Sequence, residues 1–69
     1  MQLIDSDKKV YQIAIDKVID IKVIDQLNIP LYRLKIQFID QDLDIKFKTK
    51  EERNLQLDPL IKQIDIKNL

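Results

Sequence analysis

Two stretches of alternating apolar and polar residues dominate the middle of the chain, at residues 31–38 and 43–48. The apolar positions are Tyr32, Leu34, Ile36 and Phe38 in the first stretch and Leu43, Ile45 and Phe47 in the second. An apolar residue at every second position is typical of a strand with one buried face. The acidic segment Asp40-Gln41-Asp42 separates the stretches, and aspartate favours turns because its carboxylate bonds nearby backbone. The pattern predicts an antiparallel hairpin over residues 31–49.

The first 16 residues carry a weaker version of the same pattern. A short apolar segment is followed by the polar run 5–9 and then by Tyr11, Ile13 and Ile15 at alternate positions. We therefore predict a short strand, a turn and a second strand with these three side chains on one face. A helix that starts at Ser6 is the rival interpretation, but its apolar positions would be spread around the whole helix surface.

Residues 18–24 are rich in β-branched side chains, which favour a strand over a helix. Alternation predicts one face with Ile19, Ile21 and Val23 and an opposite face with Val18 and Ile24. A strand that is apolar on both faces is usually covered on both, and in so small a chain the second cover is expected to be another protein. The predicted partner interface therefore consists of Val18, Ile19, Ile21, Val23 and Ile24, with a homodimer as the first expectation.

The C-terminal part of the chain changes to helical signals. Thr49 and Glu52 have the spacing of a capping box, which predicts a helical turn through Arg53. A proline disrupts a helix that continues through it, so Asp58 and Pro59 predict a fresh helix start, with the aspartate as N-cap and the proline at the first helical position. The last residues alternate again, which keeps a final strand open as an alternative.

These elements together predict one small domain over residues 1–69. Its expected fold is mainly β, of the α+β class, with a small antiparallel sheet or partly open barrel of four or five strands and a short C-terminal helix. A domain of this size buries only about 60% of the surface that its unfolded chain exposes. The chain has no cysteine or histidine, so disulfides and the usual zinc sites are excluded and self-association is the expected supplement to the core.

Composition narrows the chemistry further. Twelve Lys and Arg balance twelve Asp and Glu, so no net charge attracts nucleic acid or membrane. The absence of glycine excludes the phosphate-binding loops of nucleotide enzymes, and no histidine or cysteine is present to activate a nucleophile. We expect no cofactor and no enzymatic activity. No apolar run approaches the roughly 20 residues that span a bilayer, and the first residues do not form a signal peptide, which predicts a cytoplasmic protein.

One acidic cluster resembles a calcium-binding loop in its spacing. Asp40, Asp42, Asp44 and Glu51 occupy positions 1, 3, 5 and 12 of an EF-hand loop. The sixth position of such a loop requires glycine, and Ile45 stands there instead. Neighbouring lysines also cancel the negative charge, so we predict a hairpin turn and no metal site.

The polar face of the predicted hairpin is basic. Both apolar faces stay together only when the numbers of paired residues have an odd sum. One such register pairs Lys35 with Lys46 and Arg33 with Lys48, and another pairs Lys35 with Lys48 and Arg33 with Lys50. Like charges lie opposite each other in either case. Like charges directly opposite are unfavourable, which suggests a basic strip kept for binding anions. The alternative function is therefore an anion-binding module for nucleic acid or acidic lipid, although exposed lysines also simply extend into water. The candidate anion-binding residues are Arg33, Lys35, Lys46, Lys48 and Lys50.

The order of features over residues 16–66 resembles that of small bacterial pleckstrin-homology-like or GRAM-type domains. The resemblance lies in the segment IDKVIDIKVID, the hairpin LYRLKIQFI and LDIKFKT, and the run KEER followed by DPLIKQI. It implies a binding scaffold for a protein or an anionic lipid and not an enzyme.

Overall fold

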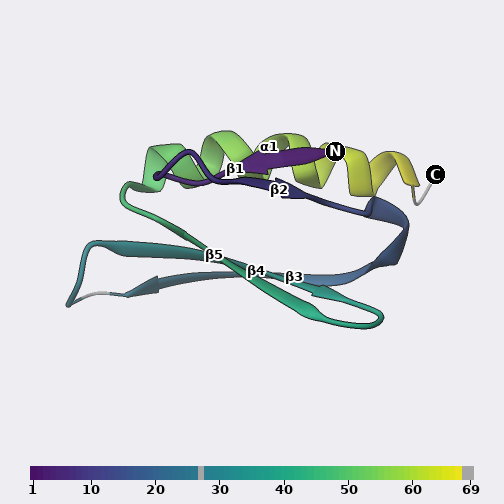
Figure 1. Ribbon diagram of the computed structural model, residues 1–69, viewed down its shortest axis with the longest axis horizontal. Helices are drawn as coiled ribbons and strands as arrows, with labels where there is room; N and C mark the ends of the chain where they lie inside the picture. The colour runs from purple at the N-terminus through teal and green to yellow at the C-terminus, as the bar shows by residue number, and fades with distance from the viewer. Residues whose placement is uncertain (27, 68–69) are drawn as a thin grey trace.

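The computed structural model describes residues 1–26 and 28–67 (Figure 1). Within these residues the elements are β1 (Gln2–Ile4), β2 (Val10–Gln12), the 3-10 turn η1 (Ile15–Lys17), β3 (Val18–Gln26), β4 (Leu31–Phe38), β5 (Asp42–Phe47) and α1 (Lys50–Lys67). The strands form a two-stranded sheet, β1-β2, and a three-stranded sheet, β3-β4-β5, and every pairing is antiparallel. The predicted α+β fold is confirmed, with open sheets in place of a barrel.

The molecule has two layers. The sheet β3-β4-β5 forms one layer, and helix α1 lies next to the β1-β2 hairpin in the other (Figure 1). Apolar side chains from both layers meet between them because each layer has one apolar face to bury. The buried apolar residues are Leu3, Ile13, Leu34, Ile36, Phe38, Ile45, Phe47 and Leu60. Strand β4 is central and contributes three of them, whereas β3 contributes none.

The register of the β4–β5 hairpin differs from both expected registers. Leu34 lies opposite Ile45, and Lys35 lies opposite Asp44. The apolar faces coincide as predicted, but both predicted registers were wrong because the turn closes earlier, with the N–H of Phe38 bonded to the carbonyl of Gln41 at 2.7 Å. This register puts Lys35 opposite a carboxylate, which is the more favourable arrangement across strands, but it leaves the like charges of Arg33 and Lys46 opposite each other.

Strand β3 contains a bulge that changes which residues share its inner face. Val18 lies opposite Phe38 and Ile21 lies opposite Ile36, with a register shift at Ile19. Directly opposed residues point to the same side of a sheet. Val18 therefore shares the inner face with Ile21, and its predicted position on the opposite face was wrong because the bulge inserts one extra residue.

Helix α1 is continuous from Lys50 to Lys67 and is longer than predicted. The N-cap of the predicted capping box is confirmed: the Thr49 hydroxyl accepts the N–H of Glu52 at 3.1 Å, and it donates to the Glu52 carboxylate at 3.2 Å. The predicted restart at Asp58 and the alternative of a final strand were both wrong. Pro59 lies inside the helix on its exposed side. Water can therefore reach the carbonyl that the proline leaves without a helical donor, so the helix continues.

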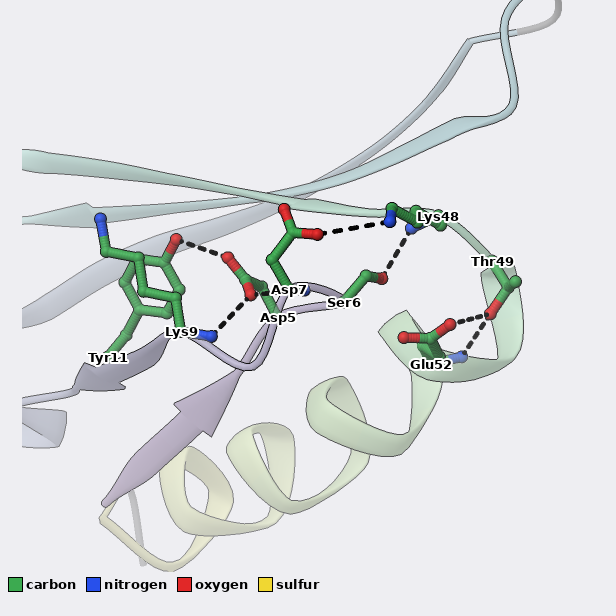
Figure 2. Close-up of polar contacts among 8 residues, drawn as sticks. All are labelled: Asp5, Ser6, Asp7, Lys9, Tyr11, Lys48, Thr49 and Glu52. Carbon is green, nitrogen blue, oxygen red and sulfur yellow. Dashed lines mark hydrogen bonds and ion pairs between the residues drawn. The ribbon is translucent and has the colours of Figure 1, made fainter.

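The turn of the first hairpin is organised by one carboxylate (Figure 2). Asp5 accepts the N–H groups of Asp7 and Lys9 and the hydroxyl of Tyr11, each at 2.9 Å. Partial desolvation by itself would raise the pKa of Asp5, but these hydrogen bonds stabilise the carboxylate and hold the pKa below its ordinary value. Lys8 has φ of 68° in this turn. The predicted hairpin is confirmed, but its second strand ends at Gln12, so Ile13 lies beyond the strand and Ile15 lies in η1.

The same turn is attached to the corner between β5 and α1. The Ser6 hydroxyl accepts the N–H of Lys48 at 2.8 Å, and the Asp7 carboxylate lies 3.3 Å from the Lys48 ammonium (Figure 2). These contacts hold the β1-β2 hairpin next to the start of the helix. The hairpin therefore covers part of the sheet that α1 leaves open.

Candidate functional site

A groove of about 470 Å³ lies between strand β3 and helix α1. Its strand side consists of Val18, Ile19, Ile21 and Val23, and its helix side consists of Leu57, Ile61 and Ile64. Several of these side chains are substantially exposed: Ile19 by 60%, Val23 by 45% and Ile61 by 43%. The groove is therefore an apolar surface that residues 1–26 and 28–67 leave uncovered.

The strand that borders the groove is an edge strand. Within the described chain, β3 pairs with β4 on one side and with no strand on the other. An edge strand presents N–H and C=O groups that another strand can pair with. The N–H of Ile21 donates to the carboxylate of Asp20 at 2.9 Å. In an antiparallel pair alternate residues direct these groups toward the neighbouring strand, so Ile21 belongs to the set that points away from β4.

A buried arginine fixes the helix at one end of the groove. The Arg53 side chain is buried, and its guanidinium pairs with the carboxylate of Asp25 at the end of β3. It also donates to the side-chain oxygen of Asn54 at 3.2 and 3.3 Å and lies 5.8 Å from the centre of the Tyr32 ring. The Lys50 ammonium lies 3.8 Å from the same Asp25 carboxylate. The first helical turns are therefore attached to the far end of β3.

A lysine fixes the helix at the other end. The Lys67 ammonium donates to the main-chain carbonyls of Ile15, Asp16 and Val18 at 3.1, 3.3 and 3.4 Å. Helix α1 thus runs antiparallel to β3, from Arg53 beside Asp25 to Lys67 beside Val18. The strand spans about 23 Å between these contacts and the helix about 21 Å, from the rise per residue of each. Because the two lengths match, the helix stays alongside the strand between these two contacts.

The structure brings together most of the predicted partner interface. Val18, Ile19, Ile21 and Val23 all line the groove, whereas Ile24 lies opposite Arg33 on the outer face of the sheet. The helix side of the groove was not predicted. Its residues, Leu57, Ile61 and Ile64, have the spacing of one helix face, and that signal is present in the sequence. The predicted restart of the helix at Asp58 concealed it.

The predicted anion-binding residues are not gathered into one basic strip. Four of the five lie beside carboxylates: Arg33 pairs with Asp44, Lys35 lies 3.9 Å from Asp42, Lys48 lies 3.3 Å from Asp7, and Lys50 lies 3.8 Å from Asp25. Lys46 lies opposite Arg33 on the sheet. The hydrogen bond from Arg33, followed by the charges of Arg33, Lys46 and Lys35, outweighs desolvation and lowers the pKa of Asp44. Anion binding here would have to compete with these carboxylates.

Half of the acidic cluster that resembles a calcium-binding loop lies in strand β5, whereas Asp40 lies in the turn before it and Glu51 lies in helix α1. Asp42 forms an ion pair with Lys35, and Asp44 forms an ion pair with Arg33. Among the described residues, no three or more Asp or Glu side chains gather in a way that would hold a metal ion. Within residues 1–26 and 28–67, no helix combines the length and apolar character needed to cross a membrane.

Comparisons with known proteins provide no relatives. No family model, curated protein or solved structure matches this chain. The resemblance to pleckstrin-homology-like domains therefore stays a prediction. The groove, the open edge of β3 and the contacts that hold them are the features on which a function can be argued.

Proposed function

We propose that this protein is a non-enzymatic interaction module that associates with a second copy of itself through strand β3. The observation that carries the proposal is the combination of an open strand edge with an apolar groove directly beside it. Main-chain groups on such an edge supply affinity, and side-chain pockets beside it supply specificity. The charge balance of the chain and its lack of histidine and cysteine agree with binding and not with catalysis.

Self-association is favoured over anion binding by the surroundings of the charged groups. Four of the five candidate cations already have a carboxylate within 4 Å, so an incoming anion gains little from them. The exposed apolar side chains of the groove have no such compensation. Their contact with water is the larger unfavourable feature of this surface.

The exposed area supports a weak dimer. Covering the exposed parts of Ile19, Val23 and Ile61 is worth about 1 kcal/mol each, because full burial of such a side chain is worth roughly 1.5–3 kcal/mol. A two-fold dimer covers each of them twice. Association itself costs about 4 kcal/mol or more in lost freedom. Burial of these side chains thus leaves about 2 kcal/mol at most. The main-chain hydrogen bonds between the paired strand edges add roughly 0.5–1.5 kcal/mol each, so a few of them bring the expected dissociation constant to roughly the millimolar range or below.

Sedimentation velocity over a hundredfold range of protein concentration tests the proposal. The wild type is expected to shift from monomer to dimer as concentration rises. Val23→Lys and Ile61→Lys are each expected to keep the protein monomeric, because they put a charge into the covered groove.

Two controls separate this surface from exposed apolar residues elsewhere. Leu55 and Ile39 are 71% and 72% exposed and lie outside the groove, so Leu55→Lys and Ile39→Lys should leave the dimer unchanged. Equal weakening by all four substitutions, or a monomeric wild type throughout the range, would contradict the proposal.

A further inference from the structure

The outward-facing edge of β3 has a charge pattern that is symmetric about one residue. Asp20 and Lys22 flank Ile21, and Ile19 and Val23 lie one position further out on either side. When two such strands pair antiparallel with Ile21 at the centre, Asp20 of each copy lies opposite Lys22 of the other, and Ile19 lies opposite Val23. Each carboxylate then faces an ammonium group, and each apolar side chain faces another apolar side chain.

We propose that the second copy pairs with β3 in this register, so that Ile21 faces Ile21 of the second copy and Asp20 faces Lys22 of the second copy twice. This inference rests on the proposed self-association and specifies its geometry. The two-fold axis passes through the centre of the paired strands, perpendicular to the sheet. Both helices therefore lie on the same side, and the two apolar grooves become neighbours across the axis.

Other registers that keep the same faces together are less complementary. A pairing centred on Lys22 would put two lysines directly opposite each other. A pairing centred on Val23 would put Lys22 opposite Ile24 and Ile21 opposite Asp25. Like charges in direct opposition and charges against apolar groups are both unfavourable in a cross-strand pair. The register centred on Ile21 avoids both.

The bulge in β3 agrees with this register. It interrupts the regular strand at Ile19, so a straight partner strand can pair only from that residue onward. Pairing centred on Ile21 needs residues 19–23, which is the stretch that begins there. The bulge also turns Val18 toward the groove, where it adds apolar surface beside the partner.

Asp20 has a second role in this geometry. In the single copy its carboxylate accepts the N–H of Ile21 at 2.9 Å, which satisfies an outward-pointing donor of the open edge. In the dimer that N–H donates to a carbonyl of the second copy, and the carboxylate is released to pair with Lys22 of the second copy. The N–H of Ile21 therefore has a hydrogen-bond acceptor in both states: the Asp20 carboxylate in the monomer and a main-chain carbonyl of the second copy in the dimer.

Charge reversal tests the register. Asp20→Lys and Lys22→Asp are each expected to weaken the dimer by roughly ten- to a hundredfold in sedimentation velocity, because two opposite-charge pairs become two like-charge pairs. An equimolar mixture of the two variants is expected to dimerise again, since lysines then face aspartates. The double variant carrying both substitutions is expected to recover the wild-type affinity. Lys46→Asp, on β5, is the matched control and should change nothing.

The outcomes distinguish the register from the proposed function. Circular dichroism first establishes that every variant keeps the wild-type spectrum and thermal midpoint within a few degrees. A dimeric wild type whose mixed or double variants do not recover would overturn the register but leave self-association standing. A wild type that stays monomeric would overturn both and leave the groove to another protein or to an apolar small molecule.

Discussion

The ion pair between Arg53 and Asp25 has one buried and one partly exposed member, and the two ways of breaking it should therefore differ in cost. The exposed fractions of the two side chains are 5% and 35%. Asp25→Asn leaves a buried guanidinium beside a neutral amide. Arg53→Met leaves a carboxylate that still contacts water and still lies 3.8 Å from the Lys50 ammonium. Although both substitutions remove the same ion pair, only the first leaves a charge buried without a countercharge.

The magnitudes follow from this difference in burial. Removing one member of a fully buried pair costs about 3–5 kcal/mol. In Asp25→Asn the guanidinium keeps its hydrogen bonds to Asn54 and its place over Tyr32, so we expect about 2–3 kcal/mol. In Arg53→Met the apolar stem is retained and only a partly solvated pair is lost, so we expect about 1 kcal/mol.

Urea unfolding followed by circular dichroism measures both values. All proteins are compared at one concentration because the proposed association with a second copy would stabilise the folded state. Lys50→Met serves as the control for loss of an exposed partner of Asp25 and should cost less than about 0.5 kcal/mol. The reasoning is refuted if Arg53→Met destabilises the protein as much as Asp25→Asn or more.

Three further predictions concern single residues. Thr49→Ala removes the helix cap and should lower the free energy of unfolding by about 1 kcal/mol in urea titrations, whereas Thr49→Ser should not. Pro59→Ala restores a helical hydrogen bond to Leu55 and should raise the thermal midpoint, with a gain of roughly 1–2 kcal/mol after allowance for the greater freedom of the unfolded chain; an unchanged or lower midpoint would count against the described helix. The pKa of Asp5 is lower in the folded state than in the unfolded state, so its stabilisation is present above about pH 4 and is lost as pH falls through the folded pKa. Thermal midpoints measured from pH 6 down to pH 2 should therefore fall less steeply in Asp5→Asn than in the wild type, and parallel curves would contradict the role of Asp5.

The sequence pattern was sufficient to predict strands β4 and β5 but not the register in which they pair. Alternation requires that apolar faces coincide, which determines whether Leu34 can lie opposite an odd- or an even-numbered residue of β5. It does not choose among registers that differ by two residues. That choice depends on where the turn closes, and the bond between Phe38 and Gln41 closes it one residue before the predicted segment. The basic strip was predicted from the wrong register.

The candidate site was predicted on the strand side and missed on the helix side. β-branched residues around Ile21 identified the strand, because such residues fit a pleated surface wherever they occur. The bulge at Ile19 left no comparable local signal, since it arises from pairing with β4. Pro59 is a strong local signal for a helix boundary, but helix α1 continues through it. Leu60, the next residue, is fully buried, and its packing stabilises the helix across the proline.

The attachment of Ser6 to Lys48 has a consequence for how the chain folds. The two residues are 42 positions apart, and Ile4 and Gln56, which are also hydrogen-bonded, are 52 apart. The strands β3, β4 and β5 follow one another directly, so their contacts close short loops and form at a smaller entropic cost. We therefore expect the meander to form before the first hairpin docks. Ser6→Ala should then accelerate unfolding while leaving the folding rate unchanged, as expected for an interaction absent from the transition state.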